Sequence, residues 1–116
     1  MQRKFRLTRS EDFKRVRRSG KSYAHPLVVL IVQTNEEPHL KVGIAAGKTV
    51  GSAVHRNRAK RLLREATRTL LPNIASNLDL ILIARPGLVT ATIEDTRQAL
   101  LNLFGRAQIL ISTNES

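Results

Sequence analysis

Cysteine and tryptophan are both absent from this chain of 116 residues. Without cysteine, the chain has no disulfide, no thiolate metal ligand and no cysteine nucleophile. Aromatic residues are scarce, with three phenylalanines and one tyrosine, so the stacking pattern of an RNA-recognition motif is missing. The longest apolar runs, 27–32 and 80–84, are far too short to cross a bilayer. We therefore expect a soluble, cytoplasmic protein that does not contact a membrane.

Acidic residues are also scarce. The chain has 9 Asp and Glu against 20 Lys and Arg, which gives a net charge of +11. Hydrophobic residues make up 41% of the chain, which is enough apolar surface for one folded domain. We place that domain at residues 1–116, with a short C-terminal tail from about residue 108. A folded chain with this charge repels itself unless its partner is a polyanion, so nucleic acid is the first candidate.

The nine acids are scattered, mostly at expected turns and helix starts, and the three histidines have no metal-ligand spacing. We therefore expect no catalytic residue, no metal site and no cofactor bound by the protein alone. Glu11 and Asp12 are better explained as first-turn acids that complement a helix dipole than as metal ligands.

Hydrophobic periodicity predicts an α+β fold in a single domain. The first helix begins near Thr8-Arg9-Ser10-Glu11, which has capping-box spacing, and ends at Gly20. The extended region before the long central helix contains two or three strands, depending on whether Pro26 divides it. The predicted elements are helix 10–19, extended runs 22–34 and 40–46, helix 54–71, strand 78–84 and helix 92–107.

The predicted helix 54–71 has two contrasting sides. At about 100° per residue, one stripe is apolar and must face the core, while the opposite side carries cations. Like charges at this spacing destabilise a helix by a few tenths of a kcal/mol per pair. A phosphate-rich partner would offset this repulsion and so explain why the cations are clustered. An ordinary solvated basic helix is the alternative. The apolar stripe is Ala59, Leu62, Leu63, Ala66 and Leu70, and the basic side is Asn57, Lys60, Arg61, Arg64 and Arg68, flanked by Arg56 and Arg58.

The stretch GKTVGSAVHRNRAKRLLRE, residues 47–65, closely resembles the signature of the bacterial ribonuclease P protein family. The Arg-Asn-Arg core at 56–58 is the centre of the match, and Leu7 to Phe13 and Leu80 to Arg85 extend it over nearly the whole chain. The resemblance implies a mixed four-stranded sheet with three helices in αβββαβα order, including a left-handed crossover. It also implies a protein subunit that assists a catalytic RNA, which with Mg²⁺ removes the 5′ leader of precursor tRNA. No obligate protein partner is implied.

The resemblance also assigns residues to two sites. The first is the surface that meets the RNA subunit, where the resemblance places Arg56, Asn57, Arg58, Lys60, Arg61 and Arg64, and to which we add the basic residues Lys48 and Arg68. The second is a cleft for the precursor tRNA leader, between the first helix and the sheet, and it comprises Phe13, Arg17, Ile31 and Asn57.

Three positions depart from the family pattern. Arg17 stands where the family often has a second aromatic residue, Ile31 replaces an aromatic residue on the facing strand, and Thr49 replaces the second residue of a lysine pair. We therefore expect leader binding to depend less on base stacking here. A ribosomal or ribosome-assembly protein is the alternative from another class, and a DNA-binding regulator is a weaker one because no helix-turn-helix spacing is visible.

Overall fold

The computed structural model describes residues 5–111 of the chain. The predicted helices and strands are confirmed to within a residue or two, and Pro26 lies between two separate strands. Three short 3-10 helices, η2, η3 and η4, join the longer elements. The elements are α1 (Ser10–Ser19), β1 (Lys21–Ala24), β2 (Val28–Thr34), β3 (Leu40–Ala46), η2 (Lys48–Val50), α2 (Ala53–Leu70), η3 (Leu71–Asn73), β4 (Leu78–Ala84), η4 (Pro86–Thr90) and α3 (Ile93–Ala107).

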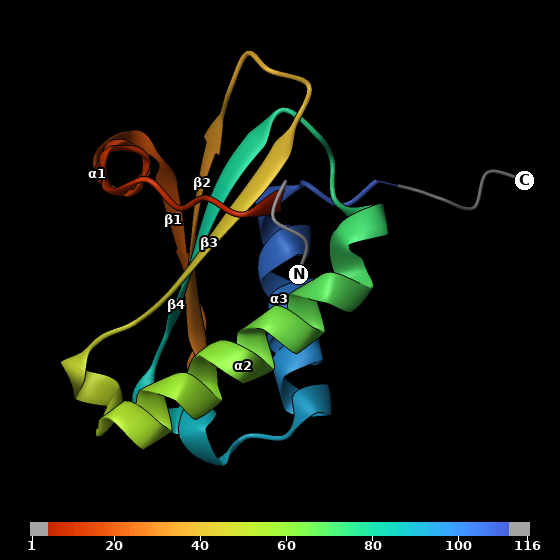
Figure 1. Ribbon diagram of the computed structural model, residues 1–116. Coiled ribbons are helices and arrows are strands. Elements are labelled where there is room, and N and C mark those ends of the chain that lie inside the picture. The colour runs from red at the N-terminus through yellow and green to blue at the C-terminus, as the bar shows by residue number, and fades with distance from the viewer. Residues whose placement is uncertain (1–4, 112–116) are drawn as a thin grey trace, which may run out of the picture.

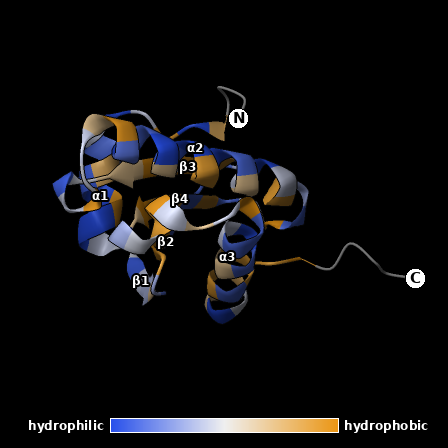
Figure 2. Ribbon diagram, turned by 90° about the horizontal axis from the view of Figure 1, so that it is seen from below, coloured by the Kyte–Doolittle hydropathy of each residue, from blue (hydrophilic) through white to orange (hydrophobic). Residues whose placement is uncertain are grey.

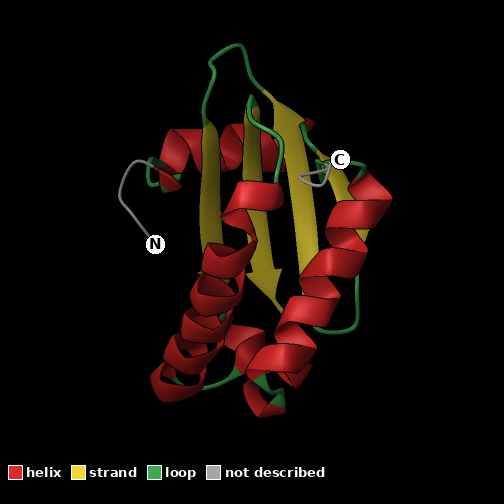
Figure 3. Cartoon of the chain, turned by 90° about the vertical axis from the view of Figure 1, so that its right-hand side faces the viewer, coloured by secondary structure: helices red, strands yellow, loops and turns green. Residues whose placement is uncertain are grey.

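The four strands form one mixed sheet in the order β1-β2-β4-β3. The β1–β2 and β2–β4 pairs are antiparallel, whereas β3 and β4 are parallel neighbours joined through α2. Seen from the side of α2 and α3, with β3 running downward, β4 lies to its right, so the crossover is left-handed (Figures 1 and 3). Parallel crossovers are right-handed in about 98% of cases, and the expected exception is confirmed.

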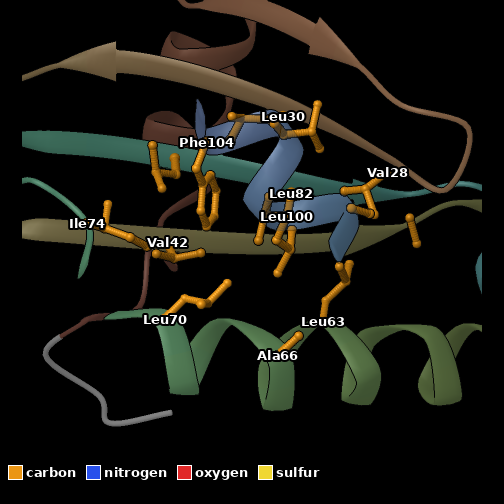
Figure 4. Packing of buried hydrophobic residues seen from close by; sticks show 14 of the residues in the cluster. Val28, Leu30, Val42, Leu63, Ala66, Leu70, Ile74, Leu82, Leu100 and Phe104 are labelled. Carbon is orange, nitrogen blue, oxygen red and sulfur yellow. The ribbon is translucent and has the colours of Figure 1, made fainter. Parts of the chain in front are cut away.

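Helices cover both faces of the sheet. The helices α2 and α3 pack on one face and α1 on the other, so hydrophobic strand residues lie between two helical layers (Figures 1 and 2). The larger core forms under α2 and α3, where Leu63, Ala66 and Leu70 of α2 point toward the sheet and toward Leu100 and Phe104 of α3 (Figure 4).

The smaller core lies under α1. It contains Leu7, Val16, Ile31 and Ile81, with Phe13 packed against it. In β4 the even-numbered residues face the larger core and the odd-numbered residues face α1, as the two-residue period of a strand requires. This run is therefore buried on both faces, which explains why its sequence shows no polar alternation.

Helix α1 lacks the predicted capping box. Its N-cap is Arg9, whose side chain makes no capping hydrogen bond, so the assignment of Thr8 and Glu11 to such a motif was wrong. A capping box is present instead at α3, where the Thr92 hydroxyl accepts from the Asp95 amide at 3.0 Å and the Asp95 carboxylate accepts from the Thr92 amide at 3.2 Å.

The segment that follows α3 remains attached to the fold up to Ile111. Ile109 is buried, its carbonyl accepts from the Ala75 amide at 2.8 Å, and the Ile111 amide donates to the Asn73 carbonyl at 2.8 Å. Residues 109–111 are thus joined to the fold, residues 112–116 lie outside the described residues, and the short C-terminal tail stays a prediction. Within residues 5–111, no helix is both long enough and apolar enough to span a membrane.

Candidate nucleic-acid interface

Helix α2 carries the basic residues, and its apolar stripe fixes how they are presented. Ala59, Leu63 and Ala66 are fully buried, as the sequence predicted, which turns the cationic side toward solvent. The helix begins at Ser52, whose hydroxyl accepts from the His55 amide at 3.4 Å. A rigid, well-packed helix thus holds the cations.

The cations divide between two flanks of α2 rather than forming a single face. Arg64 lines a groove on the side of β3, whereas Arg58 and Arg61 line a separate hollow on the side of α3. The residues of the predicted basic side therefore all lie on α2, but they extend around the helix and line two different recesses.

Arg58 is held by the protein itself. Its Nε donates to the Val89 carbonyl at 2.7 Å and its Nη2 donates to the Ala91 carbonyl at 3.4 Å. These bonds tie α2 to the turn that precedes α3. Arg58 thus has a structural role that the sequence pattern did not reveal.

We call the recess beside β3 the edge groove, because β3 is an outer strand of the sheet. Its volume is about 260 Å³, and side chains from four parts of the chain meet there. One aromatic ring and two guanidinium groups share the groove, which is the combination that stacks a base and neutralises its phosphates. The lining residues are Arg6, Leu7, Thr8, Phe13, Val42, Ile44 and Arg64.

The ring of Phe13 lies directly on the backbone of Gly43. A Cβ atom at this position would clash with the ring, so glycine is what allows the close approach. The N-terminal segment lies along the same strand, where the Leu7 amide donates to the Val42 carbonyl at 2.9 Å. Phe13 is therefore half-buried, with one part of its ring in the smaller core and another in the groove.

A buried carboxylate fixes α1 to the sheet, and sequence reasoning missed it. Asp79 of β4 accepts from Nη2 of Arg15 at 2.8 Å and from the side-chain amide of Asn35 at 3.0 Å. Arg15 also donates to Gln33 and, at 3.2 Å, to Asp12. The hydrogen bond to Asp79 is the main cause that raises the pKa of Arg15 above its ordinary value. The signal available in the sequence was one acid within an otherwise apolar strand.

The residues predicted for the leader cleft lie in different environments. Phe13 reaches the edge groove, but Ile31 is only 7% exposed, because it is covered at the end of α1 by Gly20. Ile31 thus lies in the smaller core and does not line the edge groove, and its role in leader binding stays a prediction. Arg17 and Asn57 are exposed but do not line the groove, where Arg64 takes the place expected for Asn57.

The other predicted RNA-facing residues are accessible. Lys48 is exposed on η2, Arg61 and Arg64 are exposed on α2, and Arg56 and Lys60 are half-buried. Arg68 is exposed but pairs with Glu65 at 2.9 Å. Hydrogen bonding from Arg68 lowers the pKa of the Glu65 carboxyl below its ordinary value.

The acidic residues of the described chain do not gather into a metal centre. Among residues 5–111, no three or more His, Asp or Glu side chains gather where they could hold a metal ion. Asp12 is engaged by Arg15, and Asp95 caps α3. The donor set of the described chain therefore does not fit a Mg²⁺ site.

A basic helix with two cation-lined recesses, set on a small mixed sheet, defines a nucleic-acid-binding protein. The family model for Ribonuclease P matches residues 1–108. This chain belongs to the ribonuclease P protein family. That membership decides against the ribosomal and DNA-binding alternatives.

Relatives and solved structures agree with the assignment. The ribonuclease P protein component of Herpetosiphon aurantiacus is 43% identical over 94% of this chain and 89% of its own length. That of Brevibacillus brevis is 40% identical over 95% of this chain and 88% of its own length. The RNase P protein of Staphylococcus aureus superposes with a TM-score of 0.81 at 30% identity, covering 90% of this chain and 96% of the other. The corresponding Thermotoga maritima structure has a TM-score of 0.78 at 30% identity, with coverages of 87% and 96%.

Proposed function

We propose that this subunit binds the catalytic RNA through the two flanks of α2 and binds the 5′ leader of precursor tRNA through the edge groove. The observation that carries the second part is the meeting of Phe13, Arg6 and Arg64 in one groove. Phe13 supplies a flat surface for one base, and the two guanidinium groups supply positive charge for the adjoining phosphates.

The groove lies beside the basic helix, and this proximity supports a bridging role. Arg64 belongs to α2 and at the same time lines the groove with Phe13, so one element serves both RNAs. Two RNA molecules repel each other, and a cationic protein between them lowers the cost of bringing them together. Holding the leader also reduces the freedom that the substrate must lose before cleavage.

We assign the chemistry of cleavage to the RNA subunit. Mg²⁺ supplies Lewis-acid and nucleophile activation in phosphodiester hydrolysis, and the acids of the described chain do not form a site for it. The described residues instead position the substrate and neutralise charge. The protein is thus part of an enzyme without being its catalytic subunit.

A reconstitution experiment tests this division of labour. The purified protein alone is expected not to cleave precursor tRNA at its 5′ processing site. A bacterial ribonuclease P RNA with Mg²⁺ is expected to cleave there, and the protein is expected to accelerate that cleavage at moderate salt. Specific cleavage by RNA-free protein, abolished by His55→Ala or by Glu11→Gln with Asp12→Asn, would show that the protein has its own active site.

A further inference from the structure

A second recess, which we call the α2–α3 hollow, lies between α2 and the start of α3. The two helices lie side by side on the sheet (Figure 3). The hollow has a volume of about 230 Å³ and is lined by Arg58, Arg61, Leu62, Glu65 and Ile93. Pockets for drug-sized ligands have about 300–1,000 Å³, so this one suits a single planar ring system.

Ile93 makes the hollow apolar at a position where the helix does not need an isoleucine. It is the first residue of α3 and is 43% exposed. The helix start is already held by the Thr92–Asp95 capping box, and a β-branched residue adds no helix propensity. Together with half-buried Leu62, Ile93 forms an apolar surface that the protein itself leaves uncovered.

Arg58 gives the hollow a wall of fixed orientation. Its two hydrogen bonds to the Val89 and Ala91 carbonyls hold the guanidinium plane before any ligand arrives. A preorganised guanidinium loses little conformational freedom on binding and stacks well against flat rings. Arg61 lies exposed one turn further along the same flank, where it can meet a phosphate.

Glu65 adds an acceptor to this otherwise cationic wall. Arg68 binds its Oε1 at 2.9 Å, which offsets the negative charge and leaves the second carboxylate oxygen able to accept from an incoming group. Carboxylates accept from the exocyclic amino groups of bases. The wall therefore offers both a donor and an acceptor to the edge of a base, and it favours adenine, cytosine or guanine over uracil.

We propose that the α2–α3 hollow receives one unstacked, amino-bearing base of the catalytic RNA, packed against Leu62 and Ile93. This inference rests on the proposed function, because it names one contact within the RNA-binding surface. Charge complementarity selects RNA as the occupant, since two arginines border the hollow in a chain of net charge +11. The contact is apolar at its centre, so it adds affinity that does not depend on counterion release.

The test compares two isoleucine variants of the full-length protein. Ile93→Ala removes the floor of the hollow, and Ile111→Ala is the matched control, because Ile111 is 47% exposed and lies outside the hollow. Dissociation constants for a bacterial ribonuclease P RNA are measured across a range of salt concentrations. Ile93→Ala is expected to weaken binding by about 5- to 15-fold with an unchanged salt slope, and Ile111→Ala by less than about twofold. Melting curves establish that both variants are folded.

Chemical probing identifies the base. In the wild-type complex, reagents that modify the Watson–Crick edges of unpaired bases are expected to find one protected nucleotide. That nucleotide becomes reactive again with Ile93→Ala but not with Ile111→Ala. Equal affinities of the two variants, or no nucleotide whose reactivity follows Ile93, would overturn the inference while wild-type binding still supports the proposed function. Failure of the wild-type protein to bind the RNA would instead overturn the proposed function.

Discussion

Arg15 on α1 and Asp79 on β4 form an ion pair of 2.8 Å that joins the helix carrying Phe13 to the middle of the sheet. The Asp79 side chain is 5% exposed and that of Arg15 is 38% exposed, so the pair spans the boundary between core and solvent. Because Phe13 lies two residues before Arg15, this pair also fixes the position of the edge groove.

Removal of the Asp79 carboxylate is expected to destabilise the fold. Asp79→Ala removes an acceptor that Arg15 and Asn35 share and should lower the free energy of unfolding by about 1–3 kcal/mol, less than for a fully buried pair because Arg15 is partly hydrated. Urea unfolding of Asp79→Ala, Arg15→Ala and the double variant measures the coupling, and a coupling energy near zero would contradict the role of this pair.

The pH dependence of this pair follows from the raised pKa of Arg15. A cation whose pKa is raised on folding contributes its full stabilisation below its ordinary pKa and loses it as the pH rises through the raised value. The stabilisation contributed through Arg15 should therefore be the same in urea unfolding at neutral and at mildly alkaline pH.

The cations of α2 are expected to determine the salt dependence of RNA binding. Arg61→Gln with Arg64→Gln removes one exposed cation from each flank and should reduce the slope of log K against log salt by about 0.7–0.9 for each phosphate that the variant no longer neutralises. Arg58 is unsuitable for this test because its replacement also frees the carbonyls of Val89 and Ala91. Lys21→Gln, at the opposite edge of the sheet, is the control. An unchanged slope in the folded double variant would mean that α2 is merely solvated.

Phe13 is expected to discriminate between precursor and mature tRNA. Phe13→Ala should weaken binding of precursor tRNA by about 1–3 kcal/mol more than binding of mature tRNA, if one leader base stacks on the ring. Phe13→Leu retains apolar packing against Gly43 without an aromatic face, so it should lose the same discrimination with a smaller drop in melting temperature. Equal weakening for both RNAs would place Phe13 in the core alone.

The Glu65 carboxyl is expected to report on its pairing with Arg68. Because hydrogen bonding from Arg68 lowers the pKa of Glu65, Arg68→Ala should move the Glu65 titration to higher pH in an NMR experiment. The pKa of Glu94 is lowered mainly by Gln98, so its titration should stay unchanged and serve as the internal control. Any stabilisation from the Glu65 pair is present above the ordinary glutamate pKa and is lost as pH falls through the lowered one.

Local sequence signals were sufficient for the secondary structure and for the basic helix. The apolar stripe of α2 and the turn signals at Gly20 and Pro26 depend on neighbouring residues, so they were readable without a structure. The left-handed crossover came from family resemblance, since periodicity carries no handedness.

Features that depend on the order of the strands in the sheet could not be predicted from local sequence signals. The edge groove exists because β3 is an outer strand and because Arg64 of α2 lies near Phe13 of α1, two residues from distant parts of the chain. The burial of Ile31 was not predictable for a related reason, since only the packing of α1 decides which residues on that sheet face are covered.

The hydrogen bond between Leu7 and Val42 has a consequence for synthesis on the ribosome. An outer strand with free backbone groups is a template for pairing with other chains. The internal neighbour of β3 is β4, which is made only after the whole of α2, whereas Leu7 is made before β3. Since the Leu7 amide donates to the Val42 carbonyl, the N-terminal segment is available to cover part of β3 as soon as it emerges. A nascent chain can thus protect this strand from other nascent chains on the same mRNA while β4 is still unmade.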